Sequence, residues 1–180
     1  MAQASVHLDL SEFRVRIAAL KRPHAPVVRA MNKSIASGRT AFVRGVAGDI
    51  GLKASDVREF VIVREATAQN LAATIYASAN RIPLFKFGAK GPVPSLGKGG
   101  GVTARLKGGA GRYPRAFIAT LGSGHVGVFQ RLGRARLPIA QLHGPSIWKA
   151  SDKFVEAAAA RTHEQLAKNL PREIEFEFSR

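Results

Sequence analysis

The spacing of apolar residues changes twice along this chain, and that change most restricts how the chain can fold. Residues 9–60 place apolar side chains three or four positions apart, as on one face of a helix. Residues 61–142 instead carry short apolar or alternating runs between Gly and Pro, which is typical of strands. Residues 152–178 return largely to helical spacing. This order predicts an α+β fold, with N-terminal helices, a central antiparallel or barrel-like sheet and a C-terminal helix, in one domain over residues 1–180.

The first part is expected to contain two main helices. Asp9 and Glu12 have the spacing of a capping box at the start of the first helix. Pro26 suits the first turn of the second helix, which Gly48 and Gly51 are expected to end. The second helix has an apolar face of Val28, Met31, Ile35, Phe42 and Val46, and a largely basic stripe of Arg29, Lys33, Thr40 and Arg44. Ser55 is expected to cap a further short turn at residues 56–60.

Six central runs are expected to form strands, at residues 61–63, 71–77, 82–87, 102–107, 116–121 and 126–129. The last two are expected to pair through a Gly-rich turn. Residues 88–101 form a loop that is long for an ordered connection, so we expect it to be mobile or used for docking. Residues 108–114 are expected to form another turn.

The C-terminal part is expected to be a helix over residues 152–170. Phe154, Ala158, Leu166 and Leu170 lie on one face of it. Pro171 is expected to break or kink this helix. Residues 173–178 alternate acidic and apolar side chains, and this pattern fits either a strand or a continued helix.

Charge is distributed very unevenly along the chain. The net charge is +16, from 28 Lys and Arg against 12 Asp and Glu. Residues 66–151 contain twelve basic residues and no acidic residue, whereas residues 152–180 contain six acidic and five basic residues. A surface of one sign requires an anionic partner, such as nucleic acid, a membrane or an acidic protein face, unless it only keeps the protein soluble.

Several classes of protein are excluded or disfavoured by composition. The chain has no cysteine, which excludes disulfides and thiolate zinc sites and fits assembly in a reducing cytoplasm. We expect no signal peptide and no membrane span, because no apolar run is long enough. The basic helix at residues 26–47 lacks the bulky apolar face of an interfacial anchor, so no membrane partner is expected.

No motif in the chain predicts catalysis. Gly122, Gly124 and Gly127 match G-x-G-x-x-G, but a strand is expected after them, so a hairpin turn is the better interpretation. Lys98, between two glycines, lacks the following Ser or Thr and the helix of a phosphate-binding loop. The five histidines lack metal-site spacing, and His125 is expected to be structural. We therefore predict no catalytic residue, no metal and no cofactor.

Aromatic residues near the basic ones bear on nucleic-acid binding. Tyr113, Phe85 and Phe87 lie beside Lys or Arg, and we expect these rings to face the core. Base recognition and stacking need exposed aromatic rings, whereas phosphate contact needs only Lys and Arg. Any contact with DNA is therefore expected to be non-specific and sensitive to salt.

Five segments carry a distinctive combination of residues: Ile82-Pro-Leu-Phe-Lys-Phe-Gly-Ala89, Ala116-Phe-Ile-Ala-Thr120, Ser123-Gly-His-Val-Gly-Val-Phe-Gln-Arg131, Arg136-Leu-Pro-Ile139 and Leu142-His-Gly-Pro-Ser146. Together these segments resemble the minor tail protein Z family of tailed bacteriophages. Their order and spacing are specific, and the resemblance covers roughly residues 20–170. The chain departs from the family pattern at Gln141, at His143 and in the Gly-rich stretch 97–101.

The resemblance implies a structural virion protein, not an enzyme, at the head-proximal end of the tail, acting in head–tail joining and DNA passage. We expect it to form a homo-hexameric ring that contacts tail terminator, tail tube or head–tail connector proteins, through strand edges such as 85–87 or 117–120. The acid-free centre is expected to face DNA in the lumen or an acidic neighbour. The residues predicted for this anionic contact are Lys90, Lys98, Arg105, Lys107, Arg112, Arg131, Arg134 and Arg136.

Two other functions fit the sequence less well. A host nucleic-acid-binding protein would share the basic charge, and its isolated monomer would bind nucleic acid tightly and in a salt-dependent way. A phage-borne nuclease or cell-wall hydrolase would need carboxylates grouped in a cleft, and residues 66–151 have none.

Overall fold

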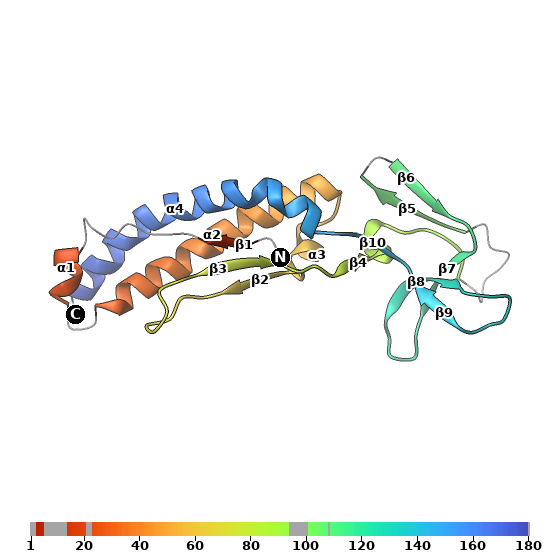
Figure 1. Ribbon diagram of the computed structural model, residues 1–180, viewed down its shortest axis with the longest axis horizontal. Coiled ribbons are helices and arrows are strands. Elements are labelled where there is room, and N and C mark those ends of the chain that lie inside the picture. Colours follow the sequence, from red (N-terminus) through yellow and green to blue (C-terminus); the bar gives the residue numbers. More distant parts are fainter. Residues whose placement is uncertain (1–2, 6–13, 21–22, 94–100, 108, 180) are drawn as a thin grey trace.

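The computed structural model describes residues 3–5, 14–20, 23–93, 101–107 and 109–179. Its α+β class confirms the prediction. The molecule is elongated (Figure 1), with two long helices, α2 (His24–Ile50) and α4 (Trp148–Phe178), side by side over most of its length and small sheets at one end. The short helices α1 (Arg14–Ala18) and α3 (Ala54–Arg58) complete the helical part.

Close packing of α2 against α4 depends on small residues of α2. A Cβ added to Gly38 would lie 1.9 Å from the Thr162 Oγ1 of α4, and one added to Gly45 would lie 2.4 Å from the Phe154 ring. One turn from Gly38, the Asn169 side chain donates a hydrogen bond of 3.0 Å to the Ser34 hydroxyl. The apolar face predicted for α2 is buried from Met31 to Val46. The antiparallel helices α2 and α4 are therefore packed closely along a buried face.

A three-stranded antiparallel sheet lies alongside α2. Its order is β1 (Gln3–Ser5), β3 (Thr74–Ala77) and β2 (Val61–Arg64), so β3 is central. The buried faces of β2 and β3 join the main core. The Asn32 side chain of α2 also donates a hydrogen bond of 3.1 Å to the Ala66 carbonyl and accepts one of 2.8 Å from the Ala66 amide. We call these helices and this sheet the helical body.

The remaining strands form a separate lobe. A neck of β4 (Arg81–Pro83) paired with β10 (His143–Ser146) joins this lobe to the helical body. We call residues 84–142 the β lobe. It contains the 3-10 helix η2 (Leu84–Phe87), the hairpin of β5 (Val102–Leu106) and β6 (Gly109–Tyr113), and the antiparallel sheet of β7 (Ala116–Thr120), β8 (Val126–Arg131) and β9 (Ile139–Gln141). Apolar side chains of the lobe belong to the same core cluster as those of the body.

Two lysines of the β lobe form ion pairs with carboxylates of the helical body. Lys86 contacts Glu59 and lies 3.4 Å from Asp56. Lys107, at the tip of the β5–β6 hairpin, contacts Asp49 near the end of α2. Burial lowers the pKa of Lys86, but the two carboxylates outweigh it and the pKa is raised overall. Both pairs help to fix the lobe against the body.

One strand prediction and one turn prediction were wrong in the β lobe. Residues 84–87 form a 3-10 helix, because Leu84 and Phe87 are three positions apart and both are buried. Residues 108–114 were expected to be a turn, yet Gly109–Tyr113 is strand β6. Pairing with β5 over five positions outweighs the weak strand propensity of its glycines.

Smaller predictions near α2 had mixed outcomes. Gly51 ends this helix with a left-handed φ of 73° and donates to the Ala47 carbonyl, as expected, whereas Gly48 lies within the helix. Ser55 does not cap α3, because Lys53 precedes that helix without any side-chain cap. The capping box of Asp9 and Glu12 lies outside the described residues.

The helix α4 runs through Pro171 to Phe178, which settles the open choice for residues 173–178 in favour of helix. Leu170 and Ile174 on either side of the proline are both buried in the core. Their packing keeps the helix continuous although the proline removes one backbone donor.

Candidate functional site

The cations predicted to meet an anionic partner do not form one cluster. The first group lies on the outer face of the β5–β6 hairpin. Thr103 of β5 pairs with Arg112 on one side and bridges to Lys90 on the other, so these three side chains form a row across one face. Arg105, two residues after Thr103, points to the same exposed face. We call Lys90, Arg105 and Arg112 the basic platform.

The loop before β5 is held to the sheets at its described end. Lys90 and Thr103 exchange two backbone hydrogen bonds of 2.8 Å, and the Ile118 amide donates to the Pro92 carbonyl at 3.0 Å. Lys90 therefore has a defined place beside the hairpin. Lys98 belongs to residues 94–100, which lie outside the described residues, so its predicted role stays a prediction.

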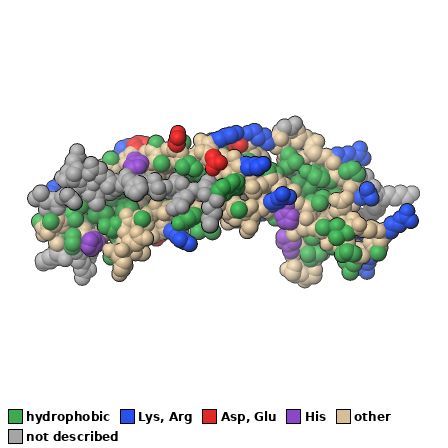
Figure 2. All heavy atoms as spheres, viewed as in Figure 1, with side chains coloured by type: hydrophobic (Ala, Val, Ile, Leu, Met, Phe, Trp, Pro, Cys, Tyr) green, Lys and Arg blue, Asp and Glu red, His purple; other side chains and the backbone are tan. Residues whose placement is uncertain are grey.

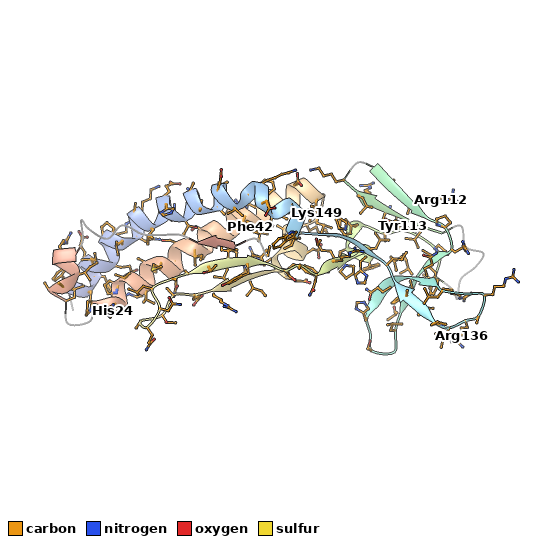
Figure 3. All side chains as sticks on the ribbon, viewed as in Figure 1. His24, Phe42, Arg112, Tyr113, Arg136 and Lys149 are labelled. Carbon is orange, nitrogen blue, oxygen red and sulfur yellow. The ribbon has the colours of Figure 1, made fainter. Side chains whose placement is uncertain are left out.

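The second group lies on β8 and on the β8–β9 loop. The Arg131 guanidinium lies over the Phe117 ring, 5.6 Å from its centroid, and both belong to the same sheet. Arg134 and Arg136 are exposed on the loop that follows. Arg112 and Tyr113 lie on the hairpin, whereas Arg136 lies at the end of the lobe away from the helices (Figure 3).

Lys107 was predicted to contact an anionic partner, but it forms an ion pair within the chain. Its ammonium is exposed but contacts Asp49, and this hydrogen bond lowers the pKa of the Asp49 carboxyl. Lys153 of α4 lies 3.6 Å from the same carboxylate. Lys107 is thus engaged in joining lobe to body, and we do not place it on the surface for a partner.

Three exposed cations of the acid-free stretch were not among those predicted for the site, and one of them, Arg81, begins β4 in the neck. Arg115 lies in the short connection between β6 and β7 with a φ of 65°, a value that is rare for a residue with a side chain. Lys149 is exposed at the start of α4, close to the neck (Figure 3). Their place in the acid-free stretch was the only signal in the sequence.

The basic stripe of α2 is partly neutralised within the chain. Arg29 binds Glu173 at 2.6 Å and Glu177 at 2.7 Å, and Lys33 also binds Glu173. Burial raises the pKa of Glu173, but hydrogen bonds from Lys33 and Arg29 lower it overall. Hydrogen bonds to the same two glutamates raise the pKa of Arg29. These cations hold α4 against α2 and are not available to a partner.

The surface view agrees with this separation of charge. In Figure 2, Asp and Glu side chains are seen only over the helical body, and the β lobe shows Lys and Arg among apolar side chains. The elongated shape thus has one end that carries cations without carboxylates. Such an end attracts anions and repels other basic surfaces.

The glycine motif and the histidines of the β lobe have structural explanations. Gly124, with a φ of 81°, turns the chain between β7 and β8, and a strand follows it, as expected for a hairpin. His125 Nε2 lies 3.0 Å from the side-chain Nε2 of Gln141, and His143 Nδ1 lies 3.2 Å from the backbone carbonyl of Gln141. The described residues include no group of three or more His, Asp or Glu side chains placed to hold a metal ion. No helix in the described part of the chain has the length and hydropathy of a bilayer span.

Of the three aromatic residues expected to face the core, two do so. Phe87 is buried, and Tyr113 is half-buried against the core. Phe85 is 39% exposed, because the 3-10 turn directs it away from Phe87. This prediction was wrong for Phe85.

Comparison with known proteins identifies the family. The family model described as prophage minor tail protein Z (GPZ) matches residues 16–180, nearly the whole chain. The chain belongs to the minor tail protein Z family. Minor tail protein Z is a structural component of phage tails, so this chain is a virion tail protein and not an enzyme. Neither the curated proteins nor the solved structures gave a match.

Proposed function

We propose that this minor tail protein Z acts at the head-proximal end of the tail, where it helps to join tail to head and to let DNA pass. The observation that supports this role most is the concentration of cations without carboxylates in the β lobe, at one end of an elongated molecule. A tail component that meets the DNA-filled head needs a surface that tolerates or attracts phosphate.

The basic platform is our candidate for the DNA-facing surface. Arg105 and Arg112 of the β5–β6 hairpin and the neighbouring Lys90 lie on one face, so three cations are presented to phosphate groups from the same side. No exposed aromatic ring belongs to this row, so the contact would be non-specific. Tail terminator, tail tube or connector proteins would supply the protein neighbours.

We further propose that the chain forms a closed ring, with six copies as the working number. Head-to-tail contacts around an axis close such a ring. The strand edges first expected to join copies need revision: residues 85–87 are not a strand, and β7 is partly covered by Pro92. The outer edges of β2 and β6 are better candidates, because each strand is at the edge of its sheet.

The experiment that tests this role is electron microscopy of lysates from phage with an early stop codon in this gene. We expect unjoined heads and tails, or joined particles that do not infect, and rescue when the gene is supplied in trans. Normal infectious particles without the protein would overturn the proposal.

The alternative, a nucleic-acid-binding protein that acts alone, is favoured only by the basic platform itself. It is separated by measuring the affinity of the isolated chain for duplex DNA at several salt concentrations. Our proposal expects weak binding by the monomer. The alternative expects tight binding and a steep fall of the logarithm of the affinity with the logarithm of the salt concentration. It also expects that changing Lys90, Arg105 and Arg112 all to Gln lowers the magnitude of this slope by about 3.

A further inference from the structure

The loop between β8 and β9, residues 132–138, exposes two large apolar side chains at the end of the β lobe. Leu132 is 69% exposed and Leu137 is 66% exposed, the highest values for large apolar side chains among the described residues. The loop is closed at its base, where the Leu132 amide donates to the Pro138 carbonyl at 3.1 Å and Arg131 pairs with Ile139. We call it the tip loop.

The charges around these leucines indicate what could cover them. Arg134 and Arg136 lie between the two leucines, and both are exposed. Exposed leucines with arginines between them suit an interface in which apolar groups fill a pocket and cations meet the polar rim. Phosphate contact would need the arginines alone. The leucines therefore favour a protein partner over nucleic acid.

We propose that the tip loop inserts into an apolar socket rimmed by carboxylates on a different protein of the particle. The inference rests on the proposed function for its setting at the head–tail junction. Leu132 and Leu137 would lose their contact with water in the socket, and Arg134 and Arg136 would pair with the rim. The tip loop is a second contact surface, separate from the basic platform.

A second copy of this chain suits the tip loop less well. An apolar groove of about 510 Å³ at the start of α2 is lined by Pro23, Ala25, Val28 and Ala68, but also by His24 and Arg29. Its lining has no carboxylate to pair with the arginines of the loop, and the glutamates beside it, Glu173 and Glu177, are already paired with Arg29. Six carboxylates of the helical body are already paired with the chain's own cations: Asp49, Asp56, Glu59, Glu164, Glu173 and Glu177.

The direct test is photo-crosslinking in assembling phage, with Leu137→p-benzoylphenylalanine. Ile62, an exposed apolar residue of the helical body (57% exposed), is the matched control position. We expect the probe at Leu137 to join a protein of different sequence, at an apolar site next to Asp or Glu residues. The probe at Ile62 should not give this product. A product with a second copy or with DNA, or no product from Leu137, overturns the inference.

Incorporation into particles gives an independent readout. The double variant Leu132→Ser with Leu137→Ser should be incorporated about tenfold less, or worse, because the anchors are lost, while its melting temperature is unchanged. Incorporation at the wild-type level contradicts the inference. Failure of the proposed function would show separately, as normal particles from the stop-codon phage.

Discussion

At the residue scale, Glu173 is the carboxylate that joins the two long helices. It is nearly buried and receives hydrogen bonds from both Arg29 and Lys33. We expect Glu173→Gln to reduce the free energy of unfolding by about 1 to 2 kcal/mol at pH 7, because charge-assisted hydrogen bonds are lost.

The pKa of Glu173 is lowered from its ordinary value of 4.5, so the contribution of Glu173 to stability is complete above that value and is lost as the pH falls below it. Chemical denaturation should therefore show a smaller difference in the free energy of unfolding between the wild type and Glu173→Gln at pH 3 than at pH 7. The exposed Glu175→Gln is the control, and an equal effect from it would contradict this role.

A second residue-scale prediction concerns the closest approach of the helices. Gly38→Ala should destabilise the protein by about 1 to 3 kcal/mol, because its Cβ would collide with the Thr162 hydroxyl and lie 3.0 Å from the Ala158 carbonyl. Gly48 lies in the same helix and has no atom within 4 Å of an added Cβ. Gly48→Ala should therefore stabilise the helix by up to about 1 kcal/mol. Thermal unfolding of both variants measures their change in stability relative to the wild type. A change of the same sign in both variants would contradict this packing.

At the element scale, the long helices and the β7–β8 hairpin were predictable because their signals are local: apolar spacing, Pro26 near one start, and glycines between two short strands. The 3-10 turn at 84–87 and strand β6 were not, because burial against the core and pairing with β5 decide them. The helix beyond Pro171 likewise depends on contact with the core. For the site, the lack of acidic residues in the central segment indicated where the cations lie. The ion pair of Lys107 with Asp49 could not be predicted, because it joins residues 58 positions apart.

The neck gives the prediction that belongs to the element scale. Lys86 pairs with two carboxylates of the helical body and lies 5.7 Å from the centroid of the Phe60 ring, so it holds η2 close to α3. Lys86→Met should loosen β4 against β10 and raise the hydrogen-exchange rate of their amides about five- to tenfold. Lys53→Met is the matched control, an exposed lysine that directly precedes α3. Unchanged exchange in the Lys86 variant would mean that backbone pairing alone holds the neck.

At the scale of the whole molecule, a body of paired helices carries a lobe whose charge has one sign. Within the body, cations and carboxylates neutralise one another between α2 and α4. In the lobe, the acid-free segment places cations on the basic platform and on the tip loop, two surfaces of different composition. This division fits the proposal that the helical body is held together internally while the β lobe offers two contact surfaces.

The most direct test of this account compares two phages with equal changes of charge. One carries Lys90→Gln, Arg105→Gln and Arg112→Gln on the basic platform, and the other carries Arg44→Gln, Lys53→Gln and Arg172→Gln on exposed sites of the helical body. Both variants should fold and enter particles. We predict that the first phage loses infectious titre by about tenfold or more, whereas the second stays near wild type. Equal titres for the two phages would contradict the claim that the β lobe carries the anion-facing surface.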